Sequence, residues 1–388
     1  MSGAPAAGAA RAAAPAAARG LRVGLVLPRL DAGGPDGVFF QLAGGLAALG
    51  LDPQLVVQEP GGHHWELAGR LPRHVVPGLG ARAASAYPVR ALARTVRELE
   101  LDVVLCTLRS VLTAATGRAL GLIRVPVVIR PANHLSRNAA ALLRAAPVKH
   151  AASWLASAAS LHAADRIVCQ SRDMYEDFRR YGVPDRKLSV IGNPVAPAVG
   201  GPPASLPGSP ALLAVGRLMA QKGFDVLIRA LPAVAERLPG VTLAIAGDGP
   251  DRSALAELAA RAGVAERVHF LGFRADVRAL MRAADLVVSA SRYEGFPNVL
   301  LEALAEGTPV VATDCPGGTR EIVSEGVTGW LCRAESEAEL AAAIVRGAAG
   351  REALAGEPIR RFAEETFSLE RIAARYAEVL SACTGGRE

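Results

Sequence analysis

Two glutamates, Glu294 and Glu302, lie on either side of a predicted helix start in residues 291–303, which read S-R-Y-E-G-F-P-N-V-L-L-E-A. Pro297 suits the first turn of this helix, because its missing N–H costs no hydrogen bond there. A helix start leaves backbone N–H groups without an intrahelical acceptor, and such a terminus binds phosphate readily. The residues of this loop and helix start that could do so are Gly295, Phe296, Asn298 and Val299.

Carboxylates beside a phosphate-binding helix start suggest a ligand that joins a diphosphate to hydroxyl-rich groups, because carboxylates accept paired hydrogen bonds from diols. A nucleotide sugar is such a ligand, with a sugar at one end and a ribose at the other. The alternative is that the helix dipole alone favours acids near the helix start. On that interpretation, the spacing of the two glutamates is a coincidence.

Two cations, Arg217 and Lys222, follow a predicted strand at residues 211–215. Charges on a loop at the carboxyl edge of a sheet can converge on one diphosphate, although a solvated pair would have the same spacing. The chain has 40 arginines and only three lysines. A lysine in such a chain can mark a position that needs a compact point charge, and a chance distribution of the three lysines is the alternative.

The first half of the chain has two candidate sites of its own. Gly33 and Gly34 follow a predicted strand at residues 21–27 and precede a helix that ends near residue 49. This arrangement brings the backbone close to a phosphate or a sugar, and its departure from G-x-G-x-x-G argues against a nicotinamide dinucleotide. His134 follows a strand at residues 127–130, where open α/β sheets bind ligands, and a solvated loop histidine is the alternative.

The elements that must position these residues alternate between apolar strands and helices, which predicts an α/β fold with doubly wound parallel sheets. A segment rich in proline and glycine reads as a linker between two domains. The predicted divisions are a disordered tail at 1–20, a first Rossmann-like domain at 21–192, the linker at 193–210, a second Rossmann-like domain at 211–366, and a C-terminal helix at 367–388 that packs back on the first domain.

Composition excludes several classes of protein. Hydrophobic residues make up 51% of the chain, and no apolar run reaches the ~18 residues of a transmembrane helix. Residues 1–20 lack the leucine-rich run of a secretory signal. The five cysteines form no C-x-x-C pair, which is typical of buried thiols in a reducing cytosol.

The net charge of +6 is distributed unevenly, with +10 over residues 1–200 and −4 over residues 201–388. An aromatic share of 4% and the lack of a recognised motif argue against nucleic acid as a partner. An anionic membrane surface or an anionic lipid-linked substrate fits the basic half better, and a solvated arginine-rich surface is the third possibility. The candidate surface comprises residues 82–97 and 137–150.

Six motifs occur in order along the chain: G-R-L-x-x-Q-K-G-F-D, G-D-G-P, F-L-G-F, E-G-F-P-N-V-L-L-E-A, G-x-P-V-V-A-T-D-C-P-G-G and E-I-V-x-x-G-x-T-G. This series resembles the retaining glycosyltransferases of family 4. The likeness is dense over residues 212–331 and looser but continuous from residue 21. It implies the GT-B fold, in which two Rossmann-like domains face each other across a cleft.

The resemblance also implies roles for the residues above. Arg217 and Lys222 match the pair that holds the donor diphosphate, and Glu302 matches the residue that binds the ribose. Glu294 matches the first acid of the E-x7-E pair, which contacts the donor sugar on the reacting face. Phe273 lies where backbone groups hold the nucleobase.

In the first domain, Gly33 and Gly34 match the family's glycine loop. The pair that often follows this loop is Ala-Glu, whereas Pro35 and Asp36 stand here, so a contact of Asp36 with the acceptor stays open. His134 lies near the residue of the family that approaches the donor sugar, although its flanking sequence differs.

The function implied is transfer of a sugar from a nucleotide diphosphate donor, UDP-linked in our expectation, to an acceptor hydroxyl with retention of configuration. We expect no cofactor and no metal, because fixed cations replace a D-x-D metal site. The acceptor would be a glycan or lipid-linked molecule in bacterial cell-surface assembly, and the enzyme cytoplasmic or peripheral on the inner membrane face. The alternatives are an epimerase or hydrolase of the same fold, and an inactive regulatory protein that binds the sugar nucleotide.

Overall fold

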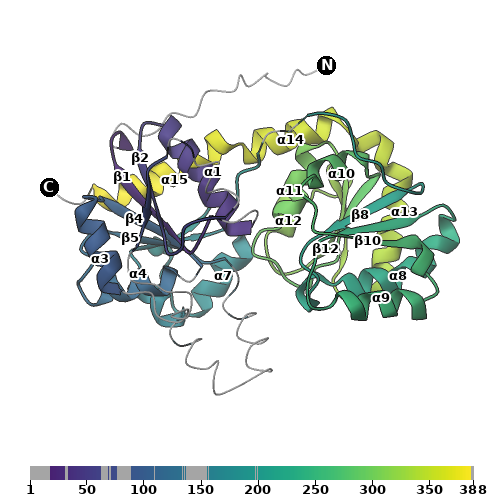
Figure 1. Cartoon of the computed structure of the whole chain (residues 1–388), viewed down its shortest axis with the longest axis horizontal. Coiled ribbons are helices and arrows are strands. Elements are labelled where there is room, and N and C mark those ends of the chain that lie inside the picture. The colour runs from purple at the N-terminus through teal and green to yellow at the C-terminus, as the bar shows by residue number, and fades with distance from the viewer. Residues whose placement is uncertain are drawn as a thin grey trace.

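The structure is a computed structural model of the chain. It describes residues 18–30, 34–62, 69, 71–76, 89–108, 110–132, 134, 136, 155, 157–196, 198 and 200–385. Two parallel sheets, each covered by helices on both faces, account for most of these residues (Figure 1). The predicted α/β fold is therefore confirmed.

The first domain contains a seven-stranded sheet in the order β3-β2-β1-β4-β5-β6-β7. Its five central strands are mostly apolar and almost fully buried, as expected for parallel strands covered on both faces, whereas the two edge strands are more exposed. The strands are β1 (Arg22–Leu27), β2 (Asp52–Val57), β3 (Arg73–Val75), β4 (Val103–Thr107), β5 (Val127–Arg130), β6 (Arg166–Cys169) and β7 (Leu188–Val190). The helices are α1 (Gly34–Ala48), α3 (Val89–Glu98), α4 (Ser110–Ala119) and α7 (Arg172–Arg180).

The second domain repeats this winding in a six-stranded sheet of order β10-β9-β8-β11-β12-β13. Its strands are β8 (Ala211–Val215), β9 (Thr242–Ala246), β10 (Val268–Gly272), β11 (Leu286–Ser289), β12 (Val310–Asp314) and β13 (Gly329–Arg333). Its helices are α8 (Phe224–Arg237), α9 (Arg252–Arg261), α10 (Val277–Ala283), α11 (Asn298–Ala305), α12 (Thr319–Ile322), α13 (Glu337–Leu354) and α14 (Glu357–Phe367). In both sheets the order reverses beside the first strand, where open α/β sheets bind ligands.

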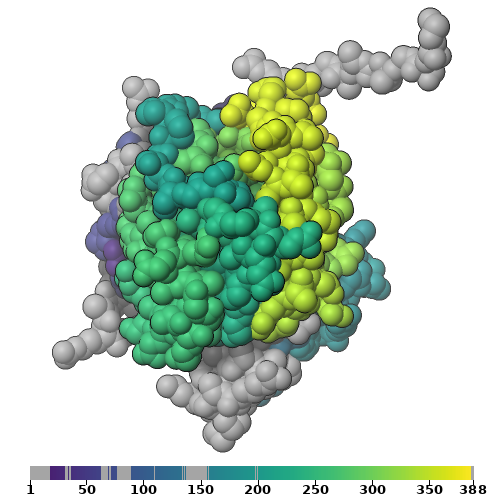
Figure 2. All heavy atoms as spheres, turned by 90° about the vertical axis from the view of Figure 1, so that its right-hand side faces the viewer, coloured from purple at the N-terminus to yellow at the C-terminus, as the bar shows by residue number. Residues whose placement is uncertain are grey.

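The last helix, α15 (Leu369–Thr384), leaves the second domain and packs on α1 of the first (Figure 1). Tyr376 and Leu380 of α15 are fully buried in the same cluster as the β1 strand. The chain therefore passes between the domains twice. The two passages lie side by side, because the N–H of Val195 donates to the carbonyl of Phe367 at 2.8 Å. Figure 2 shows the C-terminal helices along one side of the second domain.

The carboxyl edges of the two sheets face each other. Asp173, in the first turn of α7, accepts a hydrogen bond at 3.1 Å from the N–H of Gly317, in the loop after β12. The N–H of Arg172 donates to Glu321 of α12 at 2.5 Å. Loops that follow parallel strands thus meet between the domains, where the sequence places its candidate site residues.

Two short edge strands, β3 and β13, were not predicted. Residues 73–75 read R-H-V and are half-buried or exposed, so they lack the apolar signal of a covered strand. Residues 329–333 read G-W-L-C-R and end in an exposed arginine. The other edge strand of the first sheet, β7, begins at Leu188, because Lys187 closes a 3-10 turn.

Candidate functional site

Lys222 and Glu294 form the centre of the candidate site. The Lys222 Nζ lies 2.6 Å from Glu294 Oε1, and the hydroxyl of Ser291 donates to the same oxygen at 2.6 Å. The Glu294 side chain is 9% exposed and that of Lys222 is 24% exposed. The structure therefore brings together two residues that lie 72 positions apart in the sequence.

Backbone contacts between two loops hold Glu294 in place. Its N–H donates to the carbonyl of Pro316 at 2.9 Å, and the N–H of Gly318 donates to the carbonyl of Gly295 at 3.1 Å. Gly317 has a φ of +133°, and a Cβ there would lie 2.3 Å from the Glu294 carbonyl oxygen. The P-G-G motif is glycine-rich because the two loops touch backbone to backbone.

Arg217 stands on the neighbouring loop, after β8, and its side chain is exposed. Within the described parts of the chain it has neither a hydrogen-bond partner nor an ion-pair partner. Its loop is set by close packing: a Cβ on Gly247 would lie 1.9 Å from the Gly216 carbonyl oxygen, and one on Gly249 would lie 2.3 Å from that of Leu218. The G-D-G-P motif therefore supports the loop that carries Arg217.

The helix α11 begins at Asn298, directly after Pro297, as the sequence predicts. The N–H groups of Phe296, Asn298 and Val299 have no acceptor among the residues that the structure describes. The Phe296 ring is buried and packs edge to face on Phe367, with 6.0 Å between the ring centroids. This residue can offer a ligand its backbone but not its ring.

Glu302 lies on α11, half-buried and one turn before Glu306. Burial raises the pKa of Glu302, the nearby charge of Glu306 raises it further, and Arg278 opposes the shift. Glu306 itself is buried between Arg278 and Arg282, with N–O distances of 2.6 Å to each. Glu306 thus already binds two arginines. Glu302 is therefore the carboxylate of α11 that is available to a ligand.

Phe273 lies on a loop, whereas Gly34 and Asp36 lie at the start of a helix. Phe273 follows β10 and is 77% exposed, which is unusual for an aromatic side chain. Gly34 begins α1 with a φ of +55°, and Asp36 lies in the first turn of that helix. Gly33 lies outside the described residues. So do residues 81–88 and 137–154, which include most of the proposed membrane surface.

His134 is 3% exposed, so the alternative of a solvated loop histidine is wrong. Its Nδ1 lies 3.9 Å from Asp177 Oδ2, and the N–H of Ser136 donates to the same carboxylate oxygen at 3.2 Å. A carboxylate beside Nδ1 favours the tautomer that carries its proton on Nδ1. Asp177 was not singled out in the sequence, because its helix, α7, reads as an ordinary charged surface helix.

A row of polar side chains crosses between the domains beside this site. Arg130, at the end of β5, donates to the side-chain oxygen of Asn193, and Asn193 Nδ2 donates to Asn298 Oδ1 at 2.5 Å. Arg130 is 2% exposed and Asn193 is 4% exposed. Neither was predicted as a site residue. The one signal in the sequence was a charge that ends the apolar run V-V-I-R.

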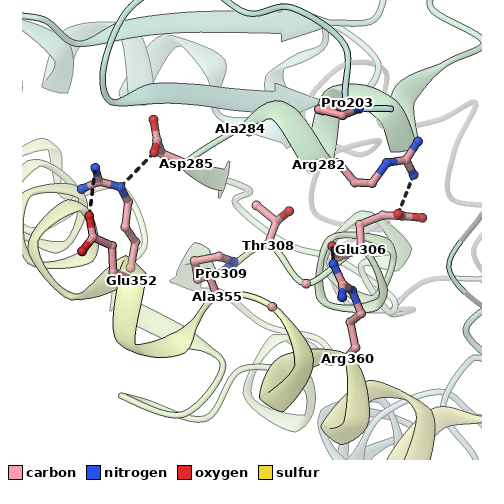
Figure 3. Close-up of a pocket in the computed structure, with 13 residues that line it drawn as sticks. Pro203, Arg282, Ala284, Asp285, Glu306, Thr308, Pro309, Glu352, Ala355 and Arg360 are labelled. Carbon is pink, nitrogen blue, oxygen red and sulfur yellow. Dashed lines mark hydrogen bonds and ion pairs between the residues drawn. The ribbon is translucent and has the colours of Figure 1, made fainter. Parts of the chain in front are cut away.

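A separate hollow of about 420 Å³ opens at the other edge of the second sheet, before β11 and β12 (Figure 3). Its arginines are held by acids or carbonyls: Arg282 contacts Glu306, Arg351 lies 2.9 Å from Asp285, and Arg360 donates to the Glu306 carbonyl. Each of these arginines thus already has a partner within the protein. It lies at the opposite edge of the sheet from Lys222 and Glu294.

Within the described ranges, no group of three or more His, Cys, Asp or Glu side chains could hold a metal ion, and no helix is long and apolar enough to cross a membrane. Independence from metal stays a prediction. All five cysteines are free. Burial raises the pKa of Cys315 to about 11 and that of Cys332 to about 12, so these thiols are protonated near neutral pH.

Two family models match the chain in succession. The model described as Glycosyltransferase Family 4 matches residues 32–199, and that described as Glycosyl transferases group 1 matches residues 209–349. One matching relative is the lipopolysaccharide core biosynthesis glycosyltransferase LpsE of Rhizobium meliloti, 43% identical over 109 residues, or 28% of this chain and 31% of the relative. Another is the glycogen synthase of Mycobacterium tuberculosis, 36% identical over 197 residues, or 50% of this chain and 46% of the relative. The matched stretches thus span a third to a half of these relatives.

Among solved structures, Anabaena HepE in complex with UDP and glucose superposes with a TM-score of 0.75, at 24% identity over 93% of this chain and 100% of that one. This likeness establishes the arrangement of two Rossmann-like domains. The two family matches fall on the two domains described above and together cover most of the chain. The chain therefore belongs to the glycosyltransferases of the family 4 type, with the GT-B fold.

Proposed function

We propose that this glycosyltransferase moves a sugar from a nucleotide diphosphate donor to an acceptor hydroxyl with retention of configuration. The observation that carries the proposal is the meeting of Lys222, Glu294 and the open start of α11 at one carboxyl edge. A cation, a carboxylate and free backbone N–H groups are what a sugar joined to a diphosphate requires.

The leaving nucleoside diphosphate gains negative charge as its bond to the sugar breaks. In the proposed site Arg217, Lys222 and the N–H groups at the start of α11 stabilise that charge. An ammonium group has three donors, and the contact with Glu294 uses one of them, so Lys222 can also bind a phosphate oxygen. Arg217 is exposed and can turn toward a ligand.

The nucleoside end of the donor lies toward Glu302 and Phe273 in this proposal. Glu302 accepts hydrogen bonds from the ribose hydroxyls, and backbone groups near Phe273 hold the base. Uracil is the base that we favour, because HepE, which shares the fold, was crystallised with UDP and glucose.

Glu294 contacts the donor sugar and supports its oxocarbenium-like state. The acceptor hydroxyl attacks from the face that the diphosphate leaves, and the departing phosphate oxygen takes its proton, so no dedicated base is required. Glu294 as a covalent nucleophile is the less favoured route, because Lys222 and Ser291 already bind its Oε1. In this proposal His134, with Asp177 beside its Nδ1, approaches the donor sugar from the first domain, and the glycine pair Gly33 and Gly34 is assigned to the acceptor.

The experiment that tests this function is a screen of nucleotide sugars for release of nucleoside diphosphate, with and without candidate glycan and glycolipid acceptors. Release that depends on an acceptor supports the transferase. Release without an acceptor indicates a hydrolase, and interconversion of the donor indicates an epimerase. Binding of the donor without turnover under any condition would leave the regulatory alternative.

The acceptor that we propose is lipid-linked, because the first half of the chain carries a charge of +10. Each basic residue close to an anionic surface contributes ~1 kcal/mol, so a few suffice for reversible peripheral binding. Co-sedimentation with anionic and neutral vesicles at two salt concentrations tests this. Recovery that is equal for both lipids and independent of salt, or none with either, would contradict the membrane proposal and leave the transferase unaffected.

A further inference from the structure

Arg130 is a buried cation that has no role in the reaction proposed above. Side chains alternate along β5, so Arg130 lies on the same face as Val128, in the core beneath α1 and α15. It is 2% exposed, its Nε and Nη1 atoms make no hydrogen bond of normal geometry among the described residues, and the buried Tyr376 hydroxyl of α15 lies beside it. A buried charge costs several kcal/mol unless it is compensated, so its presence in this core calls for a reason.

The hydrogen bonds that start at Arg130 have a fixed direction. Arginine can only donate, so the oxygen of the Asn193 side chain must face Arg130. The Asn193 amide nitrogen then points the other way and donates to Asn298 Oδ1. The Asn298 oxygen is thereby occupied, and its amide nitrogen has no acceptor among the described residues. Arg130 thus decides the orientation of two amide groups that geometry alone would leave interchangeable.

This chain of bonds ends at the first residue of α11. The Asn298 side chain is half-buried and lies beside the free N–H groups of Phe296 and Val299. A donor nitrogen added to these N–H groups strengthens an anion site, whereas a carbonyl oxygen in its place would repel an anion. The direction of these hydrogen bonds, from Arg130 to Asn298, therefore matters for the binding of any ligand that carries phosphate.

We propose that Arg130 and Asn193 are positioning residues that turn the Asn298 amide nitrogen toward the diphosphate of the donor. Arg130 belongs to the first domain and Asn298 to the second. The hydrogen bonds between them therefore also make the anion site depend on how the two domains are positioned against each other. This inference rests on the proposed function, because it takes the start of α11 as the diphosphate site.

The test is Asn193→Asp. An aspartate has the same shape and still accepts from Arg130, now as an ion pair, but it cannot donate to Asn298. The Asn298 amide then turns over to donate to the new carboxylate, and its oxygen faces the ligand. We expect an unchanged or higher Tm, together with UDP binding weakened about 10- to 100-fold, the range for a lost hydrogen bond to a charged group.

Asn193→Asp also adds a negative charge, and a double-mutant cycle with Asn298→Ala separates the two effects. If the orientation of Asn298 matters, Asn298→Ala weakens UDP binding by itself, and Asn193→Asp adds little in that background. If the added charge acts directly, its effect persists in the Asn298→Ala background and fades with salt, which would overturn the inference. Arg130→Lys keeps a donor for Asn193 and is expected to bind UDP better than Arg130→Met.

Calorimetric titration with UDP and thermal unfolding are the two measurements. Wild-type binding of UDP that Asn193→Asp leaves unchanged would overturn the positioning role alone. A wild-type protein that binds none of UDP, GDP and ADP would overturn the proposed function, and the inference with it. A lower Tm for Asn193→Asp in proportion to its weaker binding would show that Asn193 is structural only.

Discussion

Arg217→Ala and Lys222→Ala are expected to have the same effect on catalysis and different effects on stability. Each removes one cation from the proposed diphosphate site, so each should lower kcat/KM by about 10²-fold or more. In the free protein, Arg217 is exposed and without a partner in the described structure, whereas Lys222 contacts the nearly buried Glu294 at 2.6 Å. The loss of Lys222 therefore leaves a carboxylate without its counter-charge.

The size of that penalty follows from the burial of the pair. Exposed ion pairs contribute about 0–1 kcal/mol, and removing one partner of a fully buried pair costs about 3–5 kcal/mol. With side chains 24% and 9% exposed, the Lys222–Glu294 pair lies between these limits. A cost of about 1–3 kcal/mol corresponds to a Tm lower by roughly 3–10 °C for a domain of this size. Arg217→Ala should change the Tm by less than about 1 °C.

Thermal unfolding without ligand and steady-state kinetics measure the two effects. A matched double variant, Lys222→Ala with Glu294→Gln, removes the unpaired charge and should recover most of the Tm without recovering activity. Equal Tm shifts for the two single variants would refute the role of the ion pair in stability. Near-normal turnover in both would remove the diphosphate site from the proposed function.

Three other predictions follow from the same geometry. Glu302→Gln should weaken UDP binding about 10-fold or more and yet raise the Tm at neutral pH. Burial raises the pKa of Glu302, so the stability that this residue contributes is present below its unfolded pKa and is lost as the pH rises through its folded pKa. The gain in Tm from glutamine should therefore vanish below about pH 4. A gain in Tm that is independent of pH would contradict this reasoning. Gly317→Ala should reduce both the Tm and the turnover. Gly356 also has a positive φ, of +91°, but a Cβ there would meet open space, so Gly356→Ala should reduce only the Tm. Similar losses of turnover in the two variants would count against the role of the loop contact at Gly317. Activity should survive excess chelator, and loss on chelation with rescue by Mg²⁺ or Mn²⁺ would show that the fixed cations do not suffice.

The fold was predictable because its signals are local and repeated. Each central strand is a short apolar run, and some helices show their own start and stop residues, such as Pro297 before α11 and Gly307 after it. The strands that escaped prediction, β3 and β13, lie at sheet edges: β3 is half-buried or exposed and polar, and β13 is mostly buried but begins with a glycine and ends in an exposed arginine. An apolar run in the sequence indicates a strand that is buried on both faces, but it does not show which strands pair in the sheet.

The sequence singled out candidate residues where a motif groups several of them, and it missed the contacts between distant parts of the chain. Arg217, Lys222, Glu294 and Glu302 belong to motifs in which neighbouring residues reinforce each other. Ser291 lies within such a motif, but its hydroxyl bond to Glu294 depends on a side-chain orientation that spacing does not fix. His134 looked like a loop residue, because its burial comes from α7, more than 30 positions later.

Arg130, Asn193 and Asn298 show why the remaining contacts could not be predicted. They come from the end of a strand, the beginning of a linker and the start of a helix, and 63 and 105 positions separate the bonded pairs. Each residue has an ordinary local explanation: a charge at the end of a strand, an Asn before Pro194 in a linker, and an Asn after Pro297 at a helix start. Only the position of one domain against the other turns them into a directed chain of hydrogen bonds. If the proposed function holds, the motifs of the second domain identify the groups that meet the donor, and the first domain sets the orientation of one of them, the Asn298 amide.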